Sequence, residues 1–488
     1  MLPNSIMTAL NSIRLHIFSN PGRICVFLVF LWAQFTIISL ARTPTPCFPD
    51  RSSPLSVRYV KIPSPNATTS TAPAAPEPPP PRYTDDCPSG RVYAYDLPPS
   101  FNRDLVPTAC TDLDPWNWQC GIAPNHGYGR AASELRRTLP GDFHKSWYHT
   151  NEFTLELLFH HRIHKHKCRT LDPDLATAFY IPFYAGLAVG KHLWGNDTSA
   201  RDRHCELMLT WIKSQKYWKV MNGSDHFISI GRITWDFRRL TDPGKSWGSS
   251  FLNMPSMQRV IRFIIEKHPS DEMDVSVPYP TGFHPKTSDE LAGWQSFVRD
   301  HKRAALFTFI GTDRNRGEDD LRRLLMDQCR RESSSCRAVD CGVSDCARNS
   351  SVTLLPLLES EFCLQPKGDS FTSKAVFECL VAGSVPVYFT KAAYEEQYEW
   401  FLPGEQESYS IFIEQEEVRS GKVTVKEVLK RYSKEEIQRK REKVIEIIPR
   451  IIYSKPNAGV KSFRDAFDIA VDGAMERIKD EKEWVDFL

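Results

Sequence analysis

The residues best suited to chemistry lie between positions 362 and 389, in the segment FCLQPKGDSFTSKAVFECLVAGSVPVYF. The pattern predicts a strand ending near Gln365, a polar loop, a helix over 373–382 and a buried strand over 385–389. A helix that begins at the carboxyl end of a parallel strand offers free N–H groups and the positive end of its dipole to an anion. We therefore expect an anion site here, with an ordinary capped helix and a solvated Glu378 as the alternative.

The groups expected to contact this anion and its attached sugar are hydroxyl groups, a positive charge and an acid, all in the loop or the helix. They are Gly368, Asp369, Ser370, Thr372, Ser373, Lys374 and Glu378. A second polar loop follows the strand predicted at 306–310, and it contributes Gly311, Arg314 and Arg316. Their alternative is a solvated loop without a ligand. A third polar cluster surrounds an aromatic ring, as in sites that stack and hydrogen-bond sugars, or in a structural ion-pair network. This cluster comprises Arg232, Trp235, Asp236, Arg238 and Arg239.

The elements that position these loops alternate along the chain. Short apolar runs rich in β-branched and aromatic residues predict strands, and amphipathic helical patterns lie between them. We expect strands at 91–95, 178–182, 226–230, 306–310, 362–364 and 385–389, and helices at 151–164, 319–329, 433–449 and 461–480. This alternation is typical of an α/β fold with parallel sheets. Because 488 residues exceed one compact core, we expect two domains, over 88–290 and 291–488.

Composition restricts the partners and the compartment. Lys and Arg number 62 against 60 Asp and Glu, so the net charge of +2 does not favour a nucleic-acid partner. Residues 24–41 carry no charge and predict a transmembrane signal anchor after a cytoplasmic tail over 1–23, with a cleaved signal peptide as the alternative. Residues 42–87 are rich in Pro, Ser and Thr, which predicts a disordered stem. The rest of the chain is then expected in the lumen.

Sequons and cysteines agree with a lumenal location. Asn-x-Ser/Thr sequons, which predict glycosylation, begin at Asn66, Asn196, Asn222 and Asn349. The chain has 13 cysteines, of which one lies in the predicted anchor. The only tight group is Cys329, Cys336, Cys341 and Cys346, whose intervals do not match a zinc knuckle. We therefore expect disulfides here and no metal.

The segment around Gly368 resembles the donor-nucleotide segment of the exostosin-like plant glycosyltransferases, in particular the xyloglucan galactosyltransferase branch. That branch has a Gly-Asp-Ser-aromatic-Thr loop, an acidic helix and an Ala-Gly-x-x-Pro-Val turn. Further segments are similar to it in the same order, over about residues 88 to 475. These segments are residues 147–153, 180–186, 225–227, 231–239 and 278–280.

The resemblance implies a GT-B architecture, in which two Rossmann-like domains face each other across a cleft. It implies a single-pass type II Golgi membrane protein that moves galactose from UDP-galactose to xylosyl side chains of xyloglucan, with inversion. An inverting displacement needs a base for the acceptor hydroxyl and fixed charge for the leaving diphosphate. We expect His226 as the base, with Asp225 as its partner or replacement, and Glu152 as a second candidate. The alternatives are a structural His–Asp pair for the first two and an acid that only favours the helix dipole for Glu152. No cofactor is expected, because the Asp-x-Asp pairs at 112–114 and 172–174 do not follow clear strands.

The chain departs from the branch pattern beside the donor. Basic residues usually occupy both positions after the loop threonine, and the helix acid is often Asp; here the residues are Ser373, Lys374 and Glu378. The donor sugar is therefore open among galactose, galacturonate, arabinopyranose and xylose. A different class of function is an inactive polysaccharide-binding subunit that supports other Golgi glycosyltransferases. A panel of UDP-sugars with xyloglucan oligosaccharides separates these alternatives.

Overall fold

The structure is a computed structural model that describes residues 87–106, 122–240, 246–312, 320–455 and 463–487. The predicted tail and anchor, the stem up to residue 86, and Asn66, Arg314 and Arg316 lie outside these residues. Within the described part of the chain, no helix has the length and hydrophobicity needed to cross a membrane.

The first sheet has six strands, and every neighbouring pair is parallel. In spatial order they are β4 (Arg169–Thr170), β1 (Val92–Ala94), β5 (Ala178–Ile181), β6 (His226–Ile230), β7 (Ile261–Ile264) and β8 (Asp274–Ser276). The strands predicted at 91–95, 178–182 and 226–230 are confirmed as β1, β5 and β6. Strand β7 carries Arg262 at its centre, fully buried, where it donates to Asp271 and Asp274. A charged residue inside an apolar run hides a buried strand from a hydropathy pattern.

The second sheet has five strands, and these pairs are also parallel. In spatial order they are β10 (Cys336–Asp340), β9 (Ala305–Gly311), β11 (Ser360–Gln365), β12 (Val385–Tyr388) and β13 (Ile411–Phe412). Phe362 at the centre of the sheet pairs with Phe307 on one side and Val385 on the other. The strands predicted at 306–310, 362–364 and 385–389 are confirmed, and the α/β class with parallel sheets is established.

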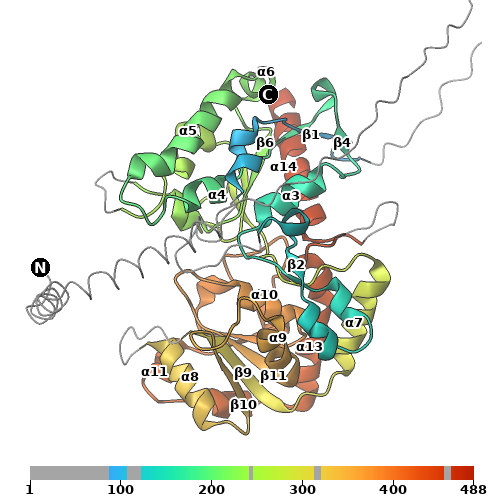
Figure 1. The fold of residues 1–488 in the computed structure, drawn as a ribbon, viewed down its shortest axis with the longest axis vertical. Helices are drawn as coiled ribbons and strands as arrows, with labels where there is room; N and C mark the ends of the chain where they lie inside the picture. The colour runs from blue at the N-terminus through green and yellow to red at the C-terminus, as the bar shows by residue number, and fades with distance from the viewer. Residues whose placement is uncertain (1–86, 107–121, 241–245, 313–319, 456–462, 488) are drawn as a thin grey trace, which may run out of the picture. The chain divides into compact units, whose positions relative to one another are not determined.

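Helices accompany both sheets (Figure 1). Those within the first half of the described chain are α3 (Leu155–Ile163), α4 (Ala185–Gly190), α5 (Thr198–Ser214) and α6 (Lys216–Met221). Those that follow in sequence are α7 (Ser288–Asp300), α8 (Leu321–Arg331), α9 (Ser350–Glu359), α10 (Lys374–Val381), α11 (Gln415–Arg419), α12 (Val425–Leu429), α13 (Lys434–Ile451) and α14 (Ala466–Phe487). The helices predicted at 151–164, 319–329, 373–382, 433–449 and 461–480 are confirmed as α3, α8, α10, α13 and α14, with shifted ends.

Helix α14 returns to the first sheet although it follows the second sheet in sequence. The ring of Phe467 lies 5.1 Å from that of Phe159 on α3, and Lys482 Nζ donates to Thr177 O at 2.8 Å. One hydrophobic cluster contains Phe227 from the first sheet and Phe307 from the second. The described residues therefore belong to one compact unit, and helix α7 runs across the boundary expected at 290, so the division into domains stays a prediction.

Disulfides occupy most of the described cysteines. The pairs are Cys87–Cys168, Cys329–Cys336, Cys341–Cys346 and Cys363–Cys379. The disulfide interpretation of the group at 329–346 is therefore confirmed. Among the cysteines that the structure describes, Cys205 carries no disulfide and is buried.

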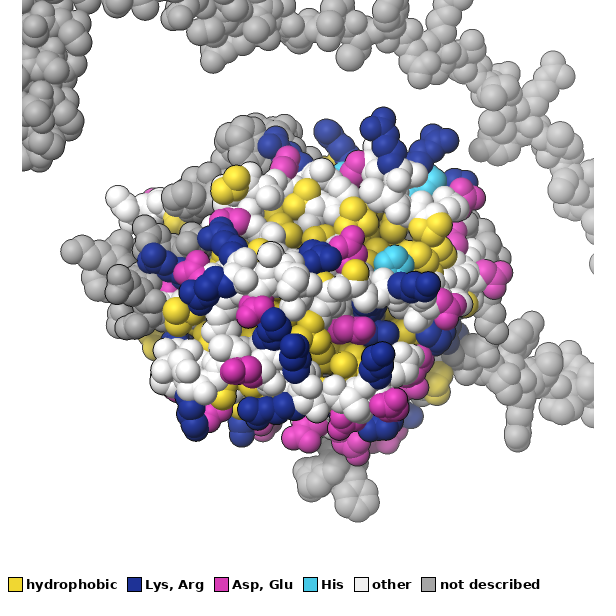
Figure 2. Space-filling view, turned by 90° about the horizontal axis from the view of Figure 1, so that it is seen from below, with side chains coloured by type: hydrophobic (Ala, Val, Ile, Leu, Met, Phe, Trp, Pro, Cys, Tyr) yellow, Lys and Arg dark blue, Asp and Glu magenta, His cyan; other side chains and the backbone are white. Residues whose placement is uncertain are grey.

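Surface charge is mixed rather than separated on the face that Figure 2 shows. Lys and Arg side chains alternate there with Asp and Glu side chains, as the net charge of +2 leads one to expect. This face offers no positive field of the kind that attracts a polyanion.

Candidate functional site

Helix α10 begins shortly after the carboxyl end of β11, and the side chain of its N-cap residue, Ser373, does not cap it. Ser373 has extended backbone angles of −161° and 168° and makes no side-chain cap hydrogen bond among the described residues. Ser373, Lys374 and Ala375 are each partly exposed. The residues at this helix start are therefore partly accessible, as an anion site at its N–H groups and dipole requires.

A small hollow of about 30 Å³ lies beside this helix start. One wall is the segment from Trp147 to Thr150, and the other comprises Ser350 of α9 with Lys374 and Glu378 of α10. Lys374 Nζ donates to Thr150 O at 2.7 Å and lies 3.3 Å from Glu378 Oε1. The structure thus brings together two of the predicted donor residues, and it places them opposite a segment that precedes α3.

The loop before α10 is occupied by a carboxylate of the protein itself. Glu266, which follows β7, accepts hydrogen bonds from the hydroxyl group of Ser370, from Phe371 N at 2.8 Å, and from Thr372 N and Oγ1 at 3.1 and 2.9 Å. Burial raises the pKa of Glu266, although these four donors oppose the rise. The Ser370 and Thr372 hydroxyl groups, expected to contact the diphosphate, therefore donate to Glu266 instead in this state.

Glu266 joins the two sheets at their carboxyl ends, since it follows β7 while the loop follows β11. Sequence reasoning missed this residue. Its signal in the sequence is an acid directly after residues 260–265, which are apolar except for Arg262. The sequence alone does not show which loop this acid binds.

Arg322 on α8 is a second functional candidate that sequence reasoning missed. A Cβ atom added to Gly311 at the end of β9 would lie 2.5 Å from one terminal nitrogen of Arg322. A Cβ atom added to Gly368 would lie 4.0 Å from the other. The guanidinium group therefore sits between two predicted donor glycines, whereas Asp369 is exposed beside them and Arg314 and Arg316 lie outside the described residues.

His149 faces the hollow and has an acidic partner. It lies on β3 (Tyr148–His149), which pairs with β2 (Arg130–Ala131). His149 Nε2 lies 3.1 Å from Glu134 Oε2, and the hydroxyl oxygen of Ser350 lies 3.4 Å from Nδ1. The carboxylate favours a tautomer with the proton on Nε2, which leaves Nδ1 as an acceptor beside Ser350.

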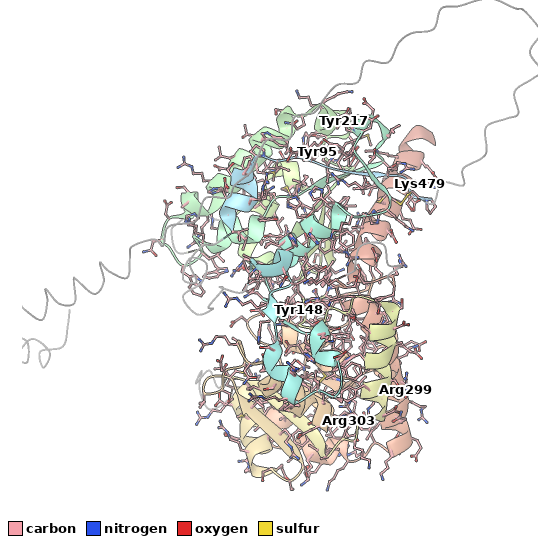
Figure 3. All side chains as sticks on the ribbon, turned by 45° about the vertical axis from the view of Figure 1, so that its right-hand side comes forward. Tyr95, Tyr148, Tyr217, Arg299, Arg303 and Lys479 are labelled. Atoms are coloured by element: carbon pink, nitrogen blue, oxygen red, sulfur yellow. A yellow bond between two sulfur atoms is a disulfide. The ribbon has the colours of Figure 1, made fainter. Side chains whose placement is uncertain are left out.

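The segment that carries His149 is fixed by neighbours far away in sequence. Tyr148 N donates to Gly282 O at 2.8 Å, and Thr150 Oγ1 lies 2.7 Å from Nε2 of the buried His284. Burial lowers the pKa of His284 to about 3, so this ring is neutral. In Figure 3, Tyr148 is labelled between Tyr95 and Arg303.

The predicted base His226 lies in a different environment. Its side chain is fully buried, its Nδ1 lies 2.7 Å from Asp225 Oδ1, and its Nε2 lies 2.9 Å from Tyr95 Oη. Burial lowers the pKa of His226, although Asp225 opposes the shift. Asp225 is buried as well and pairs with Lys482 of α14 at 3.3 Å. This geometry favours a structural pair, whereas Glu152 is partly exposed and lies three residues after His149.

The predicted acceptor cluster is largely an ion-pair network. Arg232 donates to Asp236 at 2.7 Å, Arg238 donates to Asp271 at 2.7 Å, and Arg239 pairs with Asp202. Arg232, Asp236 and Arg239 are buried, which favours the structural alternative for them. Trp235 differs because it is 37% exposed, and its ring lies 6.3 Å from that of Phe371 in the donor loop.

The described sequons differ in exposure. Asn196 and Asn222 are exposed, and Asn222 has a left-handed backbone with φ of 49° after α6. Asn349 is partly exposed and caps α9 by accepting from Ser351 N at 3.1 Å. Glycosylation of all four sequons stays a prediction.

Comparison with known proteins adds relatives to this geometry. The exostosin GT47 domain matches residues 86–429. Xyloglucan galactosyltransferase XLT2 of Arabidopsis thaliana is 48% identical over 399 residues, which cover 82% of this chain and 77% of that protein. Xyloglucan galactosyltransferase MUR3 of the same plant is 34% identical over 81% of this chain and 63% of that protein. Xyloglucan-specific galacturonosyltransferase 1, also from this plant, is 37% identical over 80% of this chain and 58% of that protein.

A crystal structure of S. aureus TarM in complex with UDP is 8% identical, with a TM-score of 0.26 over 48% of this chain and 54% of that chain. The matched domain and the relatives in contrast extend over most of the described residues, so the chain belongs to the exostosin GT47 family of glycosyltransferases.

Proposed function

We propose that the protein is an inverting, metal-independent galactosyltransferase of GT-B architecture that moves galactose from UDP-galactose to xylosyl side chains of xyloglucan. The observation that carries this proposal is the 48% identity to a xyloglucan galactosyltransferase over 82% of the chain. The uncapped start of α10 beside Lys374 and Glu378 supports it, because that arrangement suits a diphosphate and sugar hydroxyl groups.

The chemistry assigns a role to each wall of the hollow. A base removes the proton of the acceptor hydroxyl group while the oxygen of that hydroxyl group bonds to the anomeric carbon of the donor sugar. The bond from that carbon to the diphosphate breaks, and its electron pair leaves with UDP. We assign the offset of the charge that develops on the diphosphate to the N–H groups of α10 and Lys374 beside the hollow, and to Arg322 near Gly368. His149, oriented by Glu134, is our first choice for the base, and Glu152, three residues later in the chain, is the second.

Substrate binding requires the hollow to widen. At about 30 Å³ it holds roughly one water molecule, so a sugar enters only after its walls move apart. The release of Thr150 by Lys374 is the movement that we propose. A released ammonium group then becomes free to contact a phosphate. Galacturonate is the second donor candidate, because a relative at 37% identity is named for that sugar and Lys374 could pair with its carboxylate.

The test incubates the full-length chain with UDP-galactose, UDP-galacturonate, UDP-arabinopyranose or UDP-xylose and xyloglucan oligosaccharides. We expect a mass gain of one hexose with UDP-galactose, unchanged by a chelator. Transfer from another donor alone would replace the sugar in this proposal, and loss of activity on chelation would contradict metal independence. Retention of glycan without any transfer would favour an inactive binding subunit.

The proposed location is the Golgi membrane, in single-pass type II orientation with the described residues in the lumen. Four disulfides in the described residues support an oxidising compartment. Protection of the chain from protease in sealed microsomes, together with a mass shift on removal of N-glycans, is the expected result.

A further inference from the structure

Three exposed tryptophans lie on neighbouring segments of the first half of the chain. Trp194 is 48% exposed, Trp247 is 42% exposed and Trp235 is 37% exposed. The rings of Trp194 and Trp247 lie 4.9 Å apart at 70°. Trp247 Nε1 donates to Asp236 at 2.7 Å, which places Trp247 beside the residue that follows Trp235. We call these three residues the exposed tryptophan cluster.

Buried charged groups hold the backbone under this cluster. Arg201 donates through Nη2 to Gly195 O and through Nη1 to Ser246 O, both at 2.7 Å. These bonds fix the residue after Trp194 beside the residue before Trp247. Gly248 packs so closely that an added Cβ atom would lie 2.8 Å from Asp236 O and 2.9 Å from Trp235 O. The cluster is therefore built by the fold, and its indoles do not need to be ordered when a ligand binds.

The cluster continues to the donor loop. The ring of Trp235 lies 5.2 Å from His268 and 6.3 Å from Phe371, and Phe371 follows Ser370 in the loop that Glu266 holds. Exposed indoles fixed in place and rimmed by polar groups are typical of a ligand surface. Their faces suit the apolar faces of sugar rings.

We propose that the exposed tryptophan cluster binds the glucan backbone of a polymeric acceptor outside the donor site. This inference rests on the proposed function, because an enzyme that decorates a polysaccharide meets a chain much longer than its catalytic hollow. The polymer contacts Trp194 and Trp247, while a short oligosaccharide that fills only the donor side does not reach them. The cluster thus determines preference for long acceptors over short ones.

The test compares two acceptors with the full-length chain. In the variant that combines Trp194→Ala with Trp247→Ala, we expect KM for xyloglucan polymer to rise about tenfold, since each indole supplies one ring contact. KM for a short xyloglucan oligosaccharide and kcat for both acceptors should stay unchanged. The matching Trp→Phe variant should restore most of the polymer affinity. Leu171→Ala, a change at a side chain that is 78% exposed elsewhere, is the control.

Retention of the full-length chain in a gel that contains xyloglucan polymer provides a measurement that needs no transfer. Loss of retention in the double Ala variant supports the proposal even if the wild type transfers none of the sugars offered, which would contradict the proposed function alone. Equal KM changes for polymer and oligosaccharide, or no change for either, would overturn the proposal. The glycan predicted on Asn196 is the competing occupant, because that sequon lies two residues from Trp194. If the polymer is retained only by the Asn196→Gln variant, the glycan covers the cluster in the natural protein. That result would also overturn the proposal.

Discussion

Two histidines with acidic partners differ in what surrounds them, and the difference predicts opposite results for the same substitution. His149 lines the hollow with Lys374 and Glu378, while His226 is fully buried and stacks 5.0 Å from Phe179. We expect His149→Gln to lower kcat by roughly 10² to 10⁴, the usual contribution of a general base, without weakening UDP binding. His226→Gln should instead lower the free energy of unfolding by about 1 to 3 kcal/mol and leave kcat of the folded fraction unchanged.

Transfer assays, UDP binding and urea unfolding of both variants decide between the two histidines. Full activity in His149→Gln together with a large fall of kcat in His226→Gln would return the base to the residue that the sequence first favoured. A fall in UDP binding in His149→Gln would place that residue in donor binding rather than in proton transfer.

Among the helices and strands, the buried acid Glu156 links helix α3 to α4 and to the end of β6. Glu156 on α3 accepts from Gly186 N at 2.5 Å and from Gly231 N at 3.0 Å, so it connects α3 with α4 and with the end of β6. Burial raises its pKa from 4.5 to about 8, although the backbone donors oppose the rise. Between these two values the folded protein holds a proton that the unfolded chain has released. The contribution of Glu156 to the free energy of unfolding therefore falls as the pH rises through this range.

Glu156→Gln keeps an acceptor for these N–H groups and removes the titration. We expect the free energy of unfolding of the wild type to fall, relative to the variant, by up to about 1.4 kcal/mol per pH unit between about pH 5 and about pH 8. Urea unfolding of the full-length chain across this range measures the difference. Glu399→Gln, at an acid that is 61% exposed, is the control and should follow the wild type. Parallel pH profiles for Glu156→Gln and the wild type would contradict the expected shift.

Strands were predictable from the sequence where every residue of the strand is buried. Site residues were predictable only where they are close together in the sequence. The run from Ala178 to Ile181 is buried throughout, so its composition alone indicated a strand. Arg262 in β7 interrupts such a run, and its partners lie nine and twelve residues later. The loop and helix at 368–378 were recognisable because their residues adjoin. Glu266 bonds a loop that lies more than 100 residues away, so no spacing in the sequence reveals it.

Across the whole molecule, a buried ion pair between Arg162 and Asp465 links the start of α14 to α3. Arg162 at the end of α3 donates to Asp465 through both terminal nitrogens, at 2.5 and 3.2 Å, and to Ser454 O at 3.0 Å. Tyr128 Oη also donates to Ser454 O at 2.6 Å. Asp465 precedes α14, and Arg162 keeps its pKa low although burial opposes this. The pair therefore fixes the return of α14 from the second half of the chain to the first.

Removing one partner of this pair tests how strongly it holds the molecule together. Arg162→Met should lower the free energy of unfolding by about 3 to 5 kcal/mol, because Asp465 is then buried without a counter-charge. The matched control is Arg299→Met, labelled as Arg299 in Figure 3, whose pair with Glu442 is 2.9 Å long but 41% and 37% exposed. The control should cost less than about 1 kcal/mol. Denaturant unfolding of the full-length chain measures both, and combining Arg162→Met with Asp465→Asn should recover part of the loss, since the uncompensated charge disappears. Equal costs for the two methionine variants would mean that α14 is held by apolar contacts such as Phe159 with Phe467, and that the ion pair only sets where the chain turns.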